Sequence, residues 1–370
     1  MSAFGIATRL ILLLLCAPGV AEAAGFNVVL TINYESAEKT IGLYEGLSGR
    51  PNEIARLPGS RIALATTALL AQRRLEINQL EEALEAAKFK QSLAEDVFNM
   101  NTARSGVGLL KELFDAVKSR NFSQKVVSTV EQLFPEGTSL TTAIPLFFVA
   151  FGHQNIDAFV RRVEWRGETP VFVGEGEGEL TIVVNLAKAV GYGRTNDERF
   201  VRLLSTVAHE VFHAAFGVYK DNSVAWQSYY GSPREYLDQL LDLTQNEGIA
   251  HYLSLIQRAG GRLRTDQLES VNAAFREFNR TAEELRSPTI SRRRADDLIR
   301  NSNTSAYWES YGAITGMIIA KQIDNKLGRQ ALMETIALGP QDFFGKYVML
   351  MKTDTGIPPL GEVVAGRVSQ

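Results

Sequence analysis

The chain has 370 residues, of which 45% are hydrophobic and 22% are charged, and its formal net charge is −3. This composition is typical of a globular protein with one large domain or two modest ones. The small net charge and the lack of a long basic run give no indication of nucleic-acid binding. A short cluster of three arginines at residues 292–294 is expected to lie on a solvated helix face.

The first 23 residues have the features of a secretory signal peptide. Arg9 precedes an apolar run over residues 10–17, and Ala21 and Ala23 supply the small residues that a signal peptidase recognises. The apolar run is much shorter than the ~20 residues of a transmembrane helix. The single cysteine, Cys16, lies in this segment, so the mature chain would have no disulfide. We therefore expect a secreted or periplasmic protein with no stable membrane span.

Residues 24–138 are predicted to form a mainly helical region that begins with one strand. Residues 26–32 are rich in β-forming side chains, and helical periodicity follows over 35–47, 61–100 and 104–134, with a break near Asn121. Within the second helical stretch, apolar residues recur at spacings of three and four. This repeat could be a coiled-coil seam for assembly, but it covers fewer than four heptads, which favours a helix packed on its own domain. The region could be a prosegment, a cap over a groove or an integral part of one domain.

A small sheet is expected to open the second region, residues 139–370. Residues 144–151, 170–173 and 180–186 are predicted strands. Between the last two, alternating glycines and glutamates at 174–179 suit a solvent-exposed turn. A phosphate-binding loop is the alternative at this turn, and it is disfavoured because three glutamates would repel phosphate.

Helices dominate the rest of the chain. The first is expected to begin near residues 196–198, where acidic side chains favour the positive helix end, and to stop at Gly217. The second would begin after Pro233, run over 235–258 and stop at two glycines. Further helices are predicted near 265–286 and 305–326, followed by one more short helix. The fold class is therefore α+β, mostly helical, with a small mixed sheet packed on the first of these helices.

That first helix contains the motif His209-Glu210-Val211-Phe212-His213. Positions i and i+4 of a helix lie on the same face, so His209 and His213 can bind one metal ion, with Glu210 beside a metal-bound water. The chain has only four histidines, and a chance match is expected on the order of a few times in a thousand such sequences. Two helical histidines with a salt-bridged glutamate are the disfavoured alternative. His153, after an apolar strand, is expected to be structural.

A catalytic zinc site usually has three protein ligands and one open position for water. Glu247, in the middle of the following helix, is the predicted third ligand, and Gly248 would allow a close approach of that helix to the metal. His251 lies one turn further along the same face and is the competing ligand. A site with three histidines is disfavoured, because residues 214–219 lack the x-x-G-x-x-H spacing that usually follows the first motif.

The first motif, followed by Asn246-Glu247-Gly248-Ile249-Ala250, resembles the gluzincin metallopeptidases, the superfamily that includes thermolysin-like enzymes. The resemblance extends over roughly residues 144–347 and is nearer to secreted or periplasmic members. It implies a zincin-like catalytic domain, one Zn²⁺ per chain, and a peptide or protein substrate bound in extended form along an edge strand. Many gluzincins have an aspartate four residues after the ligand glutamate, where it orients a zinc-bound histidine. His251 occupies that place, so Asp242 or a backbone carbonyl would have to orient the ligand histidines.

The implied reaction is peptide hydrolysis. Zinc lowers the pKa of its bound water to about 7. Glu210 then accepts the proton as the water attacks the carbonyl, and delivers it to the leaving amine. A second donor should stabilise the oxyanion, and related enzymes supply it from a later helix. Tyr311 is the first candidate, Tyr307 the second and His251 the third, although either tyrosine could equally be a core aromatic.

Two other functions fit parts of the sequence. One is a catalytically silent zinc-binding or scaffold protein of the cell envelope. Glu210 argues against it, because a protein that only retains metal does not need this residue. The other is a purely structural helical protein without metal.

Overall fold

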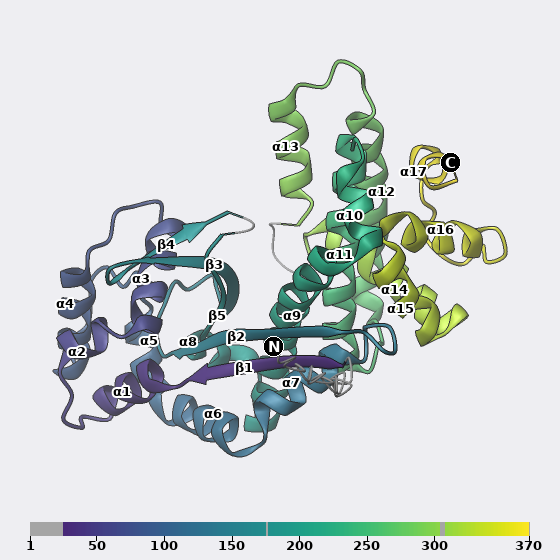
Figure 1. Cartoon of the computed structure of the whole chain (residues 1–370). Coiled ribbons are helices and arrows are strands. Elements are labelled where there is room, and N and C mark those ends of the chain that lie inside the picture. The colour runs from purple at the N-terminus through teal and green to yellow at the C-terminus, as the bar shows by residue number, and fades with distance from the viewer. Residues whose placement is uncertain (1–24, 175–176, 304–307, 370) are drawn as a thin grey trace, which may run out of the picture.

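The computed structural model describes residues 25–174, 177–303 and 308–369. The predicted signal segment, part of the glycine–glutamate turn and Tyr307 lie outside these ranges. In the described ranges, no helix has the length and apolar character needed to cross a bilayer. The architecture is α+β, with many helices around one small mixed sheet (Figure 1), which confirms the predicted fold class.

The sheet has five strands in the order β1-β2-β5-β3-β4. The strands are β1 (Phe26–Asn33), β2 (Leu140–Val149), β3 (Ala158–Arg166), β4 (Thr169–Val173) and β5 (Glu179–Asn185). β2 runs parallel to both β1 and β5, whereas β3 is antiparallel to β4 and β5. The predicted strands are confirmed, and β3 was missed because its charged residues interrupt the apolar pattern.

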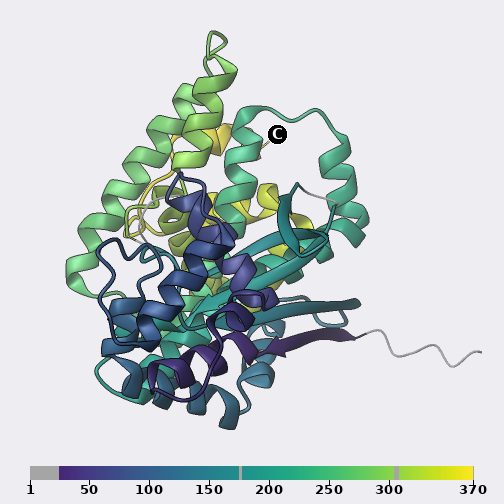
Figure 2. The same ribbon diagram turned by 90° about the vertical axis from the view of Figure 1, so that its left-hand side faces the viewer.

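Seven helices connect β1 to β2, as a parallel pair requires a long crossover. They are α1 (Glu35–Tyr44), α2 (Pro51–Ala55), α3 (Pro58–Leu70), α4 (Ile77–Lys88), α5 (Met100–Ser105), α6 (Val107–Ser119) and α7 (Phe122–Glu131). Figure 2 shows the first of these helices, in purple and blue, grouped around the end of the sheet that faces the viewer. β1 pairs with β2, so the N-terminal region contributes a strand to the common sheet. The division of the chain near residue 138 stays a prediction.

The continuous helical stretch predicted over 61–100 is wrong. The helix stops at Leu70, and left-handed backbone conformations at Gln72, Lys90 and Asn99 separate the shorter helices. The apolar face of α4 packs against α1 and α2 of the same chain, as the favoured interpretation expected. The predicted break at Asn121 is confirmed, because this residue has a φ of 53° between α6 and α7.

Helices cover both faces of the sheet. Phe148 of β2 packs on Phe122 of α7 at a ring-centroid distance of 5.8 Å, whereas Gly59 of α3 lies directly against Phe147. Neighbouring residues of a strand point to opposite faces, so α3 and α7 lie on opposite sides. The helix α9 (Asn196–Asn222) shares the α7 side and contacts β2, β3 and β5. The sheet therefore supports the helix that carries the His-Glu-x-x-His motif.

The start of α9 follows the prediction, but its end does not. Thr195 caps the helix by accepting the Glu198 N–H at 3.2 Å, and the Glu198 carboxylate accepts the Thr195 N–H in return. Gly217 does not stop the helix, which continues to Asn222. Gly217 has ordinary helical backbone angles, and a single glycine inside a long helix costs little stability.

Helix α11 (Tyr236–Ala259) lies between α9 and α14 (Tyr311–Leu327). Pro233 lies before its first turn and not within it, because Glu235 forms the N-cap. The helix ends at Gly260, which has a φ of 58°. The remaining helices are α8 (Leu186–Ala189), α10 (Val224–Gly231), α12 (Leu268–Leu285), α13 (Arg292–Asn301), α15 (Arg329–Leu338), α16 (Pro340–Met351) and α17 (Glu362–Val368), with 3₁₀ turns η1 (Val190–Tyr192) and η2 (Thr265–Gln267). The pair α12 and α13 projects from the body of the protein (Figures 1 and 2), and the three arginines at 292–294 are exposed, as expected.

The crossing of α11 and α14 leaves no room for side chains at its centre. A Cβ atom built on Gly316 would lie 2.1 Å from the Thr244 carbonyl oxygen, and one built on Gly248 would lie 2.3 Å from the Gly316 Cα. The expected role of Gly248 is therefore corrected, since it admits the backbone of α14 and not the metal-side helix. Helix α14 supports from behind the helix that carries Glu247.

Substituting Gly316 by alanine is expected to lower the free energy of unfolding by about 3 kcal/mol, because overpacking forces two backbones apart. Gly345 in α16 is the matched control, since a Cβ built there meets nothing within 4 Å. Gly345→Ala should change stability by less than about 1 kcal/mol, in the stabilising direction. Urea unfolding measures both, and equal stabilities of the two variants would contradict the tight crossing.

Candidate metal centre

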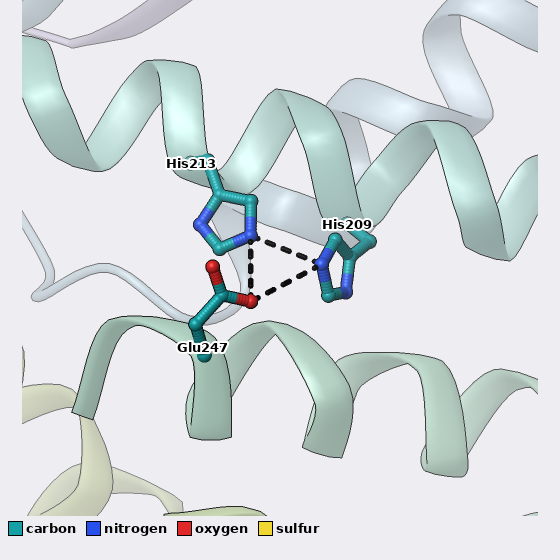
Figure 3. A group of neighbouring side chains, drawn as sticks. All are labelled: His209, His213 and Glu247. Atoms are coloured by element: carbon teal, nitrogen blue, oxygen red, sulfur yellow. Dashed lines mark hydrogen bonds and ion pairs between the residues drawn. The ribbon is translucent and has the colours of Figure 1, made fainter. Parts of the chain in front are cut away.

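Three side chains from two helices converge on one point (Figure 3). His209 and His213 project from α9, and Glu247 projects from α11. Their ligand atoms all lie within 4.8 Å of one another. Glu247 Oε2 is 3.4 Å from His213 Nε2 and 3.8 Å from His209 Nε2, and the two Nε2 atoms are 3.0 Å apart.

This spacing suits zinc. Bonds of about 2.1 Å to a tetrahedral ion place neighbouring ligand atoms about 3.4 Å apart, and the three distances scatter around that value. Imidazole nitrogens and a carboxylate oxygen are also the donors that zinc accepts in catalytic sites. Small shifts of the side chains would let all three bind one ion and leave a fourth position for water.

Each histidine is oriented by a group from α11. The Oδ1 atom of Asn246 lies 3.0 Å from His213 Nδ1, and the His209 ring forms a hydrogen bond with the backbone of Ala250. An Nδ1–H that donates to an oxygen leaves the Nε2 lone pair for a metal. Asp242 does not take this role, because it pairs with Lys220 at 2.6 Å and accepts from Tyr230 at 2.9 Å.

Burial and mutual charge set the titration of the metal-free group. Burial lowers the pKa of His213, but the charge of Glu247 and the hydrogen bond to it outweigh this and raise it to about 9. Burial raises the pKa of Glu247, and its interactions with His213 outweigh that effect and lower it to about 2. The metal-free site therefore holds a proton on His213, which a metal ion would displace on binding.

The pKa of Glu210 is shifted in the opposite direction to that of Glu247. Burial raises its pKa to about 7; the charge of His213 opposes this shift, while the charges of Glu247 and Asp157 add to it. A carboxylate with a pKa near neutrality can both accept and release a proton at physiological pH, which is the property of a general acid–base group.

Comparison with protein-family models adds independent support. Residues 52–356 match the family described as "Putative zinc dependent peptidase (DUF5700)". The chain belongs to the DUF5700 family. The matched residues run from α2 to beyond α16 and include both helices of the metal centre. Searches of curated proteins and of solved structures found no match.

The DUF5700 family match fits a zinc site. The structure also gives contacts for two other residues of the sequence analysis, Tyr311 and His153. The Tyr311 hydroxyl donates to the Leu298 carbonyl at 3.0 Å and accepts from the Thr281 hydroxyl at 3.1 Å. It therefore binds α12 and α13 here, and its role as an oxyanion donor stays a prediction. The other candidate tyrosine lies outside the described residues. His153 Nδ1 accepts the Asn155 N–H at 3.3 Å, away from the metal centre.

A polar chain beside Glu210 escaped the sequence analysis. Arg258 of α11 donates to the Thr206 hydroxyl at 2.8 Å, and Tyr192 forms hydrogen bonds with both Thr206 and Asp157. Thr206 precedes Glu210 by four residues, so both occupy one face of α9. These hydrogen bonds connect the start of β3 and the end of α11 to the face of α9 that carries Glu210. The sequence offered no signal for it, because its members come from four separate segments.

Removing the Asn246 side chain tests the orientation of His213. We expect Asn246→Ala to lower zinc affinity by about 10–100-fold, the usual cost of losing a hydrogen-bond partner of a ligand histidine. Asn246→Asp keeps an acceptor for His213 Nδ1 and is expected to bind zinc at least as well as the wild type. Chelator competition measures both affinities. An alanine variant with wild-type affinity would show that His213 needs no such partner.

Proposed function

We propose that this protein is a gluzincin-type metallopeptidase, which hydrolyses peptide bonds with a zinc-activated water and Glu210 as general base. The observation that carries this proposal is the convergence of His209, His213 and Glu247 from two helices, next to the half-buried Glu210 carboxylate outside the ligand group. Membership of the DUF5700 family supports the general activity.

In this proposal His209, His213 and Glu247 hold one zinc ion per chain. When bound, zinc supplies Lewis acidity for the substrate carbonyl and lowers the pKa of water. Glu210 accepts the proton of the attacking water and transfers it to the leaving amine. Tyr311 is the proposed donor to the developing oxyanion, for which its hydroxyl would have to leave the Leu298 carbonyl.

The alternative is a zinc-retaining protein without turnover. The environment of Glu210 favours the enzyme, because partly desolvating a carboxylate beside Glu247 and Asp157 costs free energy that metal retention alone does not require. We also propose that the segment 1–23 directs export, so that a peptide or protein substrate is met outside the cytoplasm. Sequencing the N-terminus of the exported protein tests this, and residue 24 is the expected first residue.

Metal analysis and peptide cleavage test the proposed function together. Purified wild type should contain stoichiometric zinc and cleave members of a peptide library. A chelator should abolish cleavage, and added zinc should restore it. Wild type without stoichiometric zinc would overturn the enzyme proposal. Stoichiometric zinc without cleavage of any peptide would favour the binding or scaffold protein.

A further inference from the structure

One face of α11 provides the carboxylate of the metal centre and the hydrogen-bond partners of its two histidines. Asn246, Glu247, Ala250 and His251 follow one another at positions i, i+1, i+4 and i+5, which a helix places on the side facing α9. Asn246 and Ala250 bind the two histidines, and Glu247 is the carboxylate of the group. His251 is the one member of this face to which the proposed reaction gives no task.

The position of His251 is tightly defined. Its Nδ1 lies 3.0 Å from the Glu247 carbonyl oxygen and 4.0 Å from Glu247 Oε2. Its ring meets the His209 ring edge-on, at a centroid distance of 4.9 Å and an interplanar angle of 70°. The side chain is almost fully buried, with an exposed fraction of 8%. Because Nδ1 faces a carbonyl, it must carry the proton and donate, which fixes the ring plane.

We propose that His251 is a positioning residue, which holds the His209 ring and the Glu247 backbone so that the metal ligands stay convergent. Its edge-on ring contact restricts rotation of His209, while its hydrogen bond ties it to the residue that supplies the carboxylate. This inference rests on the proposed function. It assigns to an imidazole the place where many gluzincins have an aspartate.

The charge of the metal centre differs between a histidine and an aspartate at position 251. Glu210, Glu247 and Asp157 already put three carboxyl groups in or beside the centre. An aspartate in place of His251 would add another negative charge and weaken the pull of a bound zinc ion on water. A neutral imidazole orients its neighbours without that cost. The net charge of zinc with its one carboxylate ligand stays at about +1.

Three substitutions separate the ring contact of His251 with His209 from its hydrogen bond to the Glu247 carbonyl. His251→Ala loses both, His251→Asn keeps a donor near the Nδ1 position, and His251→Phe keeps a ring against His209. The readouts are zinc affinity by chelator competition, the visible absorption of the cobalt(II)-substituted protein, which reports ligand geometry, and kcat and KM separately. His153→Ala is the matched control for loss of a histidine outside the centre.

The alanine variant should bind zinc about 10–100-fold more weakly, show an altered cobalt spectrum and lose more in kcat than in KM. The asparagine and phenylalanine variants should each recover part of the affinity. Wild-type affinity and an unchanged spectrum in the alanine variant would overturn the proposal. Complete loss of metal in all three variants would also overturn it, by making His251 a ligand. If wild type binds zinc but cleaves no peptide, the proposed function fails, while affinity and spectrum still decide the role of His251.

Discussion

Replacing Glu210 with glutamine is expected to abolish most peptidase activity while zinc stays bound. Glutamine has the shape of glutamate but cannot accept a proton from water, and loss of a general base typically costs about 10²–10⁴-fold in kcat. Zinc should remain, because Glu210 is not one of the three residues whose ligand atoms converge. Activity on the best library peptide and zinc content, measured on the same preparation, test both halves of this expectation.

The pH profile distinguishes a lost base from general damage. The metal-free pKa of Glu210 is raised to about 7, chiefly by burial, and a general base works only when deprotonated. Wild-type kcat/KM should therefore fall as pH drops through the pKa of Glu210. A bound cation lowers that pKa, so the acidic limb is expected at or below pH 7. The residual activity of Glu210→Gln should lack this limb.

Glu269→Gln, on the exposed surface of α12, is the matched control and should keep both the rate and the pH profile. If Glu210→Gln retained wild-type activity with its zinc, a different group would have to be the base. Asp157 would then be the next candidate, since its charge acts on Glu210.

Local helix geometry explains why part of the site was predictable. His209 and His213 had to share a face because they are four residues apart on one helix. Glu247 required a tertiary contact, and it was predicted because the next long helix was expected to cross the first. The structure brings its carboxylate to within 4.8 Å of both histidines, and its role as a ligand stays a prediction. Asn246 could have been inferred in principle, since the residue before a helical ligand also faces the partner helix. Tyr192 and Asp157 could not, because only the packing of separate loops brings them to Thr206.

In the fold, too, elements with a clear local sequence pattern were predictable and the others were not. Strands with unbroken apolar runs and helices with clear caps were predicted well, whereas β3, with its charged residues, was not. Short helices such as α10 and α13 carry too few buried residues to reveal their period. Gly248 was assigned to the wrong neighbour, because a glycine shows that something comes close but not which element does.

Glu247→Ala is expected to lower zinc affinity by more than about 100-fold. This loss exceeds the usual cost of removing a hydrogen-bond partner of a metal ligand. The reason is both charge and geometry. Glu247 is the only acidic member of the group, and without it two neutral imidazoles would have to hold a dication. Chelator competition measures the affinity, and Glu269→Ala on the surface of α12 should leave it unchanged.

Glu247→Asp sharpens this prediction because it keeps the charge and withdraws it by one methylene group. The wild-type oxygen already lies 3.4 and 3.8 Å from the two histidine nitrogens, so a shorter carboxylate should reach the ion poorly and give an intermediate affinity. An aspartate variant as weak as alanine would mean that position matters more than charge. Unchanged affinity in Glu247→Ala would move the third ligand to His251, and His251→Ala should then lose the metal that Glu247→Ala retains.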